Sequence, residues 1–203
     1  MVSGLDAPWS MVRLESGSTL VRERDTSVVK ELLADGKVRD VGTVPGVSAS
    51  GEGGLLGLEF ADGWVFAYFT AASDNRLMRF ALEGDAGSYI LGASEDVLTG
   101  LAKAGNHNGG RIKLGPDGMP YATVGDASNP SSAQEVSSYN GKILRMQLDG
   151  SVPEDNPIAG SLVYSMGHRN PQGLAWDSSV RLWAGEFGQH TGDEINLIAP
   201  NGN

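Results

Sequence analysis

The chain of 203 residues is long enough for one sizeable domain, and its 29 glycines without any cysteine favour a turn-rich β protein and exclude disulfides, thiol catalysis and cysteine-bound metals. Its formal net charge of −10 disfavours nucleic-acid partners, because an acidic surface repels phosphate groups. No apolar run reaches the roughly 18 residues of a membrane span, and the first residues lack the basic and apolar regions of a signal peptide.

Four units of alternating apolar and polar residues follow one another at about residues 5–45, 46–100, 101–160 and 161–203. The strands expected in the first two units are 10–14, 19–23, 28–33, 55–60, 64–70 and 76–82. Those expected in the last two are 111–114, 121–124, 142–148, 174–176, 181–186 and 194–198. Outer strands are expected at 38–44, 95–98 and 162–166.

Strand–turn–strand units that recur about every 50 residues, with no helical period, predict an all-β fold of the β-propeller class with about four blades. A β-sandwich also has short strands, but it gives no reason for a glycine-rich start to recur at the same phase of each unit. The stretch 127–140 is expected to be a loop inserted over one face of the third unit. Since the fourth unit shows no outer strand, the single domain 1–203 is expected to be an incomplete ring.

Polar residues precede the first strand of three units, at the point where a propeller strand starts from the central channel. They are Glu52, His107, Asn108, His168, Arg169 and Asn170. The loops after two second strands, at Gly125-Asp126 and Gly188-Gln189, are expected to approach the same face. The sequence therefore predicts one pit in which His107 and Arg169 flank a single planar guest.

His107 is the best candidate for a general base, because an imidazole accepts a proton near neutral pH, and Asp126 is placed to orient it. The alternative is that His107 only caps backbone groups in a turn. Arg169 offers a planar cationic fork for a carboxylate or quinone oxygen, with the amide of Asn170 beside it. The alternative for Arg169 is an ion pair between blades.

The loop at residues 188–194 offers backbone carbonyls and the carboxylates of Asp193 and Glu194, which are the hard oxygen ligands that Ca²⁺ prefers. The spacing is not that of an EF-hand, and a solvated acidic turn explains it equally well. A zinc site built from the three histidines, at positions 107, 168 and 190, lacks a local ligand pair. No serine elbow, Walker loop or Rossmann fingerprint is present.

An ordered set of motifs carries a family resemblance over almost the whole chain. The motifs are EGGLLGL at 52–58, HNGGR at 107–111, GPDGM at 115–119, GDA at 125–127, NGKILR at 140–145, GHRNPQGLA at 167–175 and DEINLI at 193–198. Together they strongly resemble the soluble quinoprotein glucose/sorbosone dehydrogenase family, the PQQ-dependent aldose sugar dehydrogenases. The resemblance implies a six-bladed propeller that oxidises the anomeric carbon of an aldose to a lactone, with pyrroloquinoline quinone (PQQ) and Ca²⁺ as cofactors.

The resemblance also implies roles for individual residues. His107 resembles the base that takes the hydroxyl proton while hydride passes to the quinone, and Asp126 resembles its orienting partner. Arg169 and Asn170 resemble the donors that polarise the quinone carbonyl. The remaining implied cofactor-binding positions are Glu52 and Asn108, and the implied Ca²⁺ positions are Gly188, Gln189, Asp193 and Glu194.

The resemblance further implies an external electron acceptor and a periplasmic or secreted location. The family's members are far longer than this chain, which looks like a truncated member and lacks the cationic residues of their last blades. Two alternatives stay open: a calcium-dependent lactonase-like hydrolase, with side chains from Glu52, Asn108, Asp126 and Asn170 on one ion, and a non-catalytic propeller that binds a partner. A homodimer that covers an exposed sheet edge is also possible.

Overall fold

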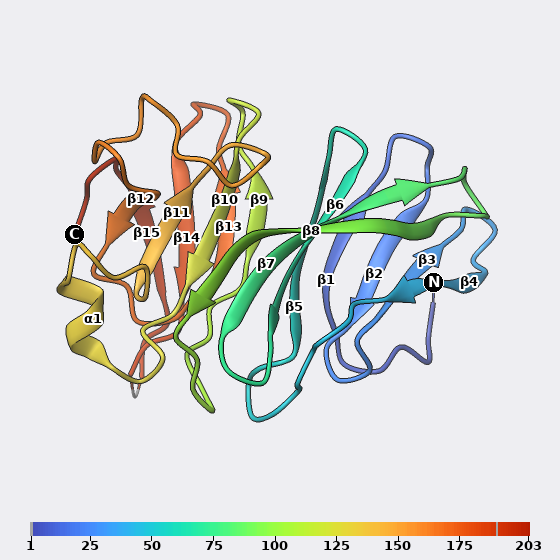
Figure 1. Cartoon of the computed structure of the whole chain (residues 1–203), viewed down its shortest axis with the longest axis horizontal. Helices are drawn as coiled ribbons and strands as arrows, with labels where there is room; N and C mark the ends of the chain where they lie inside the picture. The colour runs from blue at the N-terminus through green and yellow to red at the C-terminus, as the bar shows by residue number, and fades with distance from the viewer. Residues whose placement is uncertain (1, 190) are drawn as a thin grey trace. The chain divides into compact units, whose positions relative to one another are not determined.

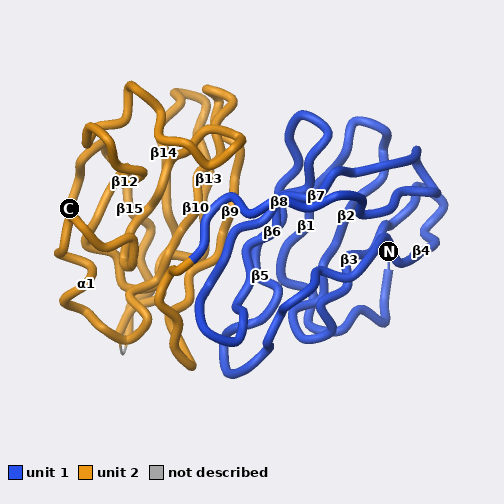
Figure 2. The backbone as a smooth tube through the Cα atoms, viewed as in Figure 1, with its two compact units in different colours: residues 1–99 blue, residues 100–203 orange. Residues whose placement is uncertain are grey.

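The structure of the chain, a computed structural model, describes residues 2–189 and 191–203. These residues form β-strands and one short α-helix, and no helix among them is long and apolar enough to cross a membrane. The chain divides into two compact units, residues 1–99 and 100–203, which Figure 2 colours separately. Two antiparallel sheets make up each unit.

The first sheet of unit 1 contains four strands in the order of the chain. They are β1 (Pro8–Arg13), β2 (Thr19–Glu23), β3 (Val28–Leu32) and β4 (Val38–Thr43) (Figure 1). β2 is buried along its whole length, whereas β3 alternates between buried and half-buried positions. This difference follows from the pleat, because successive side chains of a strand point to opposite faces of the sheet.

The second sheet of unit 1 has the same up-and-down order. Its strands are β5 (Leu55–Ala61), β6 (Trp64–Thr70), β7 (Asn75–Glu83) and β8 (Ile90–Leu101). Asp62 and Gly63 alone connect β5 to β6, and both have positive φ, which is the geometry of a tight type I′ hairpin turn. The two sheets share a core in which Leu20, Val29 and Leu58 are fully buried.

The first sheet of unit 2 consists of β9 (Ile112–Leu114), β10 (Pro120–Val124), β11 (Lys142–Arg145) and β12 (Val163–Met166), again paired in the order of the chain. The short helix α1 (Pro130–Gln134) lies between β10 and β11. The second sheet consists of β13 (Pro171–Trp176), β14 (Leu182–Glu186) and β15 (Glu194–Ile198). The Tyr121 ring packs edge-on against the rings of Tyr164 and Trp176, each at 5.1 Å, and joins the two sheets in one core.

The four sheets confirm the predicted all-β fold of the β-propeller class. Each sheet is built from strands that are consecutive in sequence, as in propeller blades, whereas a sandwich would interleave strands between two sheets. β12 pairs with β11, so the third sheet extends beyond the boundary expected at residue 160. The division of one domain into blade-like units at the expected residues stays a prediction.

Three local predictions were wrong. The stretch 127–140 is not only loop, because it contains α1; Pro130 favours a helix start, since its fixed φ suits the first turn and its missing N–H needs no partner there. The strand expected at 142–148 ends at Arg145, and a turn follows in which Gly150 N–H donates to the carbonyl of Gln147 at 3.0 Å. β8 is also much longer than the expected 95–98.

Candidate active site

A cavity of about 530 Å³ opens in unit 2, beside the loops that follow β10 and β12. Its lining includes His107, Asp126, Gln134, Arg169 and Gln189. These side chains come from four segments that are far apart in the sequence. The structure therefore brings His107 and Arg169, which the sequence predicted to flank one guest, to the wall of the same cavity.

The loop that carries His107 is held against the end of β10. His107 itself has a positive φ of 57°, and its carbonyl accepts a hydrogen bond from Ala127 N at 3.1 Å. A Cβ atom built on Gly125 would overlap that carbonyl oxygen, so only glycine allows the two backbones to approach so closely. The glycine-rich sequence around residues 107–110 and 125 thus serves to place the imidazole.

His107 and Asp126 form a hydrogen-bonded pair in which Nδ1 lies 2.8 Å from Oδ1. The same carboxylate oxygen accepts the backbone N–H of Ser128 at 2.7 Å, and Asp126 is only 2% exposed. An ionised carboxylate only accepts hydrogen bonds, so Nδ1 carries the proton and Nε2 becomes the basic nitrogen of the ring. This is the tautomer that a general base needs.

Arg169 is held at both ends of its backbone. Its carbonyl accepts the N–H of Asp126 at 2.8 Å, and its own N–H donates to Glu186. Its guanidinium donates through Nη1 to the carbonyls of Phe187 at 3.0 Å and Gly188 at 3.1 Å. A guanidinium fixed in a cavity wall can receive a carboxylate or carbonyl oxygen of a guest.

The two asparagines proposed for cofactor binding are buried, each 1% exposed, and both organise loops. Asn108 exchanges two hydrogen bonds with the backbone of Ala104, at 3.2 Å and 2.9 Å. Asn170 accepts the backbone N–H of Gly109 at 3.0 Å. Asn170 therefore links the loop of Arg169 to the loop of His107, and neither amide is among the side chains that line the cavity.

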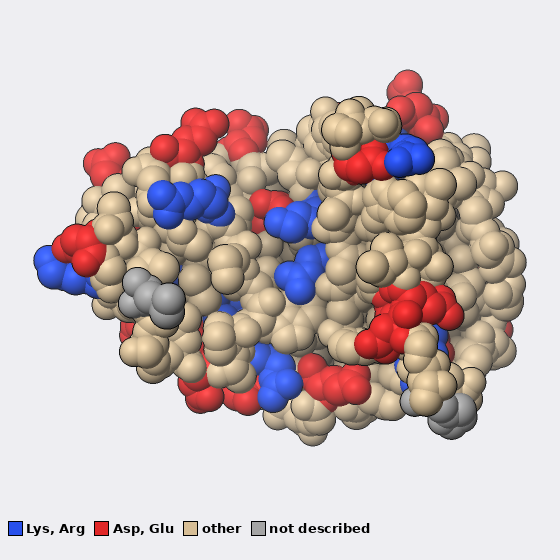
Figure 3. All heavy atoms as spheres, turned by 180° about the vertical axis from the view of Figure 1, so that it is seen from behind, with Lys and Arg blue, Asp and Glu red and all other residues tan. Residues whose placement is uncertain are grey.

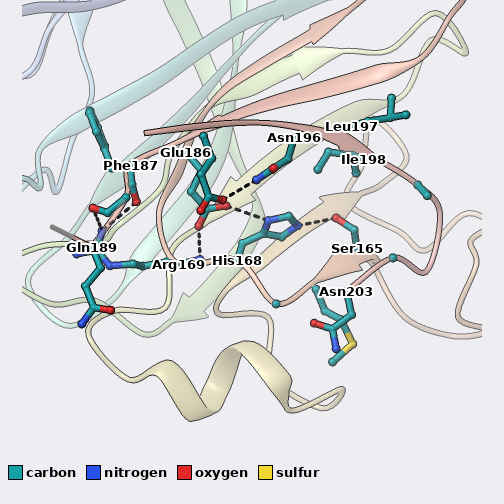
Figure 4. A pocket seen from close by; sticks show the side chains of 16 residues that line it. Ser165, His168, Arg169, Glu186, Phe187, Gln189, Asn196, Leu197, Ile198 and Asn203 are labelled. Atoms are coloured by element: carbon teal, nitrogen blue, oxygen red, sulfur yellow. Dashed lines mark hydrogen bonds and ion pairs between the residues drawn. The ribbon is translucent and has the colours of Figure 1, made fainter. Parts of the chain in front are cut away.

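His168, which the sequence placed in the predicted pit, lies beside Arg169 together with Ser165 and Glu186, to which no prediction assigned a role. His168 Nε2 is 2.7 Å from Ser165 Oγ, and His168 Nδ1 is 3.1 Å from Glu186 Oε2 (Figure 4). Burial raises the pKa of Glu186, but hydrogen bonds from His168 and from the backbone of Asn170 and Arg169 outweigh it, so the pKa lies below its usual value. The sequence held one signal: in β14 the buried phase Leu182, Ala184, Glu186 ends on a carboxylate.

Lys142, at the start of β11, is a second buried ionisable residue that sequence reasoning did not single out. Its Nζ donates to the carbonyls of Ser132 at 2.8 Å, Ala133 at 2.9 Å and Asn140 at 2.9 Å. Burial lowers its pKa to about 8. Ala133 belongs to α1 and lines the cavity. Lys142 therefore links the helix in the cavity wall to strand β11.

The loop proposed for Ca²⁺ does not gather its acidic side chains. Asp193 accepts the N–H of Gly188 at 3.2 Å, and Glu194 accepts the amide of Asn196 at 3.0 Å. The described residues contain no group of three or more histidine or acidic side chains that could hold a metal. His190 lies outside the described residues, so the three-histidine zinc hypothesis is tested only by His107 and His168, which bind different carboxylates.

Glu52 belongs to unit 1, in an exposed turn next to the bridge between Ser50 and Gly53. Its predicted part in the site of unit 2 stays a prediction.

Acidic and basic side chains lie close together on the face drawn in Figure 3. The described residues on this face form no continuous basic surface of the kind that follows a phosphate backbone.

Comparison with known proteins identifies the family. The family model described as glucose/sorbosone dehydrogenase matches residues 5–203. The chain belongs to the glucose/sorbosone dehydrogenase family. The motif resemblance seen in the sequence is thereby confirmed.

Similar members of the glucose/sorbosone dehydrogenase family include two curated proteins. Quinoprotein glucose dehydrogenase B of Acinetobacter calcoaceticus is 30% identical over 243 aligned residues, which cover 100% of this chain and 50% of that protein. Aldose sugar dehydrogenase YliI of Escherichia coli K12 is 28% identical, with 95% of this chain and 57% of that protein covered. The chain thus spans about half the length of these curated relatives.

Solved structures agree with the family assignment. The PQQ-bound aldose sugar dehydrogenase of Streptomyces coelicolor is 47% identical, has a TM-score of 0.93, and is matched over 98% of this chain and 62% of that one. A structure described as a putative oxidoreductase (glucose dehydrogenase) from Thermus thermophilus is 37% identical with a TM-score of 0.90, over 100% of this chain and 64% of that one.

Proposed function

We propose that the protein oxidises an aldose at its anomeric carbon to a lactone with PQQ as the hydride acceptor. The observation that carries the proposal is one cavity lined by the hydrogen-bonded pair of His107 and Asp126 together with the guanidinium of Arg169. A base and a cationic clamp on one wall are the two groups that this oxidation requires. Membership of the glucose/sorbosone dehydrogenase family supports it, and the proposal concerns the activity of the whole protein.

In the proposed reaction, Nε2 of His107 takes the proton of the anomeric hydroxyl while the C–H bond at that carbon breaks. Asp126, which holds Nδ1 at 2.8 Å, then stabilises the imidazolium and keeps the ring in place. The chemistry that PQQ supplies when bound is acceptance of the hydride, hence two electrons, and an external electron acceptor must then remove them. The sugar loses one proton and one hydride and leaves as a lactone.

The cavity fits the quinone. PQQ carries carboxylates and carbonyl oxygens, and the wall offers the guanidinium of Arg169 and the amide of Gln189 as donors for them. Arg169 would bind a guest oxygen and favour negative charge there, so it would both hold and polarise the quinone. The PQQ-bound relative from Streptomyces coelicolor supports this identity of the guest.

Calcium fits less well. On the family resemblance, Ca²⁺ is held by the carbonyls of Gly188 and Gln189, but the Gly188 carbonyl here accepts the guanidinium of Arg169 at 3.1 Å. A second cation at that oxygen would be repelled unless Arg169 moved to an anionic guest. The described residues hold no group of three or more histidine or acidic side chains to bind the ion, and no step of the reaction is assigned to it.

A calcium-dependent hydrolase is the less favoured alternative. It would need side-chain oxygens of Asn108 and Asn170 on one ion, and both of these oxygens accept backbone N–H groups instead. The family resemblance also suggests a periplasmic or secreted location, which fits oxidation of an external sugar. Fractionation of the native host with an antibody against the chain tests that location.

The proposed function is tested with purified chain, PQQ, an aldose and a redox dye. We expect dye reduction that falls by about 10²–10⁴-fold in His107→Ala, because that is the usual contribution of a general base. Equilibrium quenching of protein fluorescence by PQQ should change little, since the base acts on the sugar. Ser178→Ala, in an exposed turn, is the matched control. Dye reduction that survives His107→Ala undiminished would exclude His107 as the base.

A further inference from the structure

A second cavity, of about 610 Å³, adjoins the first through residues that line both, among them His168 and Arg169. Its wall contains a chain of three hydrogen-bonded side chains, Ser165, His168 and Glu186 (Figure 4). Each is at least nine-tenths buried, with exposures of 2%, 8% and 9%. The proposed reaction uses none of the three. His168 precedes Arg169 in the sequence, and Glu186 accepts the backbone N–H of Arg169.

The direction of the hydrogen bonds in this chain follows from the charge of Glu186. As an ionised carboxylate, Glu186 accepts the Nδ1 proton of His168, so Nε2 of the same ring carries a lone pair. Ser165 must then donate its hydroxyl proton to Nε2, across 2.7 Å. One tautomer of His168 therefore satisfies the hydrogen bonds of all three side chains.

The other carboxylate oxygen of Glu186 holds the backbone of the clamp. Oε1 accepts the N–H of Arg169 and the N–H of Asn170, the latter at 2.9 Å. From the opposite side, the Arg169 carbonyl accepts the N–H of Asp126 at 2.8 Å. The peptide groups of Arg169 thus connect Glu186 directly to the carboxylate residue that orients the base.

We propose that Glu186, held in place by His168 and Ser165, is a positioning residue that fixes Arg169 relative to the pair of His107 and Asp126. Two backbone hydrogen bonds to one carboxylate oxygen set where the Arg169 main chain lies, and the guanidinium follows from it. The consequence for PQQ rests on the proposed function, whereas the consequence for the backbone of Arg169 does not.

The same order of groups, serine to histidine to carboxylate, occurs in nucleophilic hydrolases, where the serine attacks the substrate. A serine nucleophile requires an accessible oxygen and N–H donors for the oxyanion. Ser165 is 2% exposed, and the N–H groups of Met166, Gly167 and His168 already donate to the carbonyls of Gly202, Ala133 and Gly141. The geometry therefore favours a positioning role for these three side chains over a nucleophilic role for Ser165.

The test compares Glu186→Gln with the parent chain by two-dimensional ¹H–¹⁵N NMR without any cofactor. We expect His168 to show a single Nδ1–H tautomer in the parent and a mixture in the variant. The amide signals of Arg169, Asn170 and Asp126 should shift, because the hydrogen bonds that fix their peptide groups weaken. Glu154→Gln, an exposed carboxylate, is the matched control and should leave these signals unchanged.

The second readout is the Kd for PQQ, measured by fluorescence quenching. We expect Glu186→Gln to raise this Kd by about tenfold, the effect of losing one charge-assisted contact, and a cooperative melting transition checks that the variant is folded. Glu186→Asp keeps the charge but shortens the reach, so it should give a smaller change in the same direction, and it replaces the Gln variant if that does not fold.

The outcomes separate the two proposals. If the parent chain binds no PQQ, the proposed function fails for this chain, and the amide shifts alone decide the positioning role. If the amide signals of Arg169 and Asn170 do not move in either variant, the positioning role is overturned. Covalent labelling of Ser165 by a fluorophosphonate probe, read by mass spectrometry, would also overturn it in favour of a nucleophile.

Discussion

At the scale of single residues, the site depends on two carboxylates that each hold a histidine in one tautomer. Asp126 holds His107 at the cavity, and Glu186 holds His168 behind it. Both residues are almost fully buried, and each carboxylate accepts a backbone N–H in addition to its histidine. The pair of His107 and Asp126 lines the cavity proposed for the substrate. The pair of His168 and Glu186 supports the backbone of Arg169 in the cavity wall.

We expect Asp126→Asn to lower kcat for aldose oxidation on the order of a hundredfold, because the imidazolium loses its stabilising charge and the preferred tautomer is no longer enforced. The Kd for PQQ should change only a few-fold. Stopped-flow dye reduction measures the first quantity and fluorescence quenching the second. Asp62→Asn, in a hairpin turn of unit 1, serves as the control; a variant of Asp126 with full kcat contradicts the pairing as a catalytic device.

At the scale of elements, the helix α1 is bound to the sheet by one buried basic side chain, Lys142. The helix has only five residues, no acidic residue in its first turn and no basic residue in its last, so little of its stability comes from the helix itself. Lys142 supplies three hydrogen bonds to carbonyls, two of them in α1. The cavity wall is therefore stabilised from below by the sheet.

Lys142→Met should destabilise the chain by about 1–3 kcal/mol at pH 7, because buried carbonyls lose their donor. The pKa of Lys142 is lowered by burial to about 8 from 10.5, so between these values the unfolded state binds more protons than the folded state. The free energy of unfolding contributed by Lys142 therefore rises with pH in that window.

Urea unfolding of both chains from pH 7 to 10.5 checks this sign. The stability difference, parent minus Lys142→Met, should grow above pH 8 by no more than about 3 kcal/mol. Lys113→Met, at a half-buried position in β9, is the control for loss of a lysine. A difference that shrinks with rising pH contradicts the assignment.

At the scale of the whole molecule, β15 is the outermost strand of its sheet among the described residues. Its side chains Ile195 and Leu197 are 78% and 53% exposed. An exposed strand edge with apolar side chains favours pairing with another strand. The predicted homodimer would bury this edge against a second copy of the chain.

We expect concentration-dependent association of the chain in sedimentation velocity, and Ile195→Lys should reduce it, because a lysine on an edge strand opposes strand pairing. Val180→Lys replaces another exposed apolar side chain, 64% exposed and outside the strands, and should leave the association unchanged. If the chain sediments as a monomer at every concentration, or if both variants behave alike, the predicted dimer through β15 is wrong.

Most of the fold could be predicted from the sequence because its cues are local. Strands β2, β6 and β15 have the predicted bounds, since alternation and flanking glycines set them within a few residues. The candidates His107, Asp126 and Arg169 were found because glycine-rich loops mark each of them. The roles of Asn108 and Asn170 were harder to foresee, because an amide in such a loop can face a ligand or the backbone with the same sequence.

By itself, the sequence determined the strand order, the propeller class and the loops that carry the candidate base and clamp, because alternation and turn glycines act over a few residues. Only the tertiary structure decided that Glu186 holds the Arg169 backbone, that Lys142 fastens α1, and that the Gly188 carbonyl accepts a guanidinium. These contacts join segments about 10 to 20 residues apart. Their geometry depends on how loops pack beside the sheets, which no local pattern specifies.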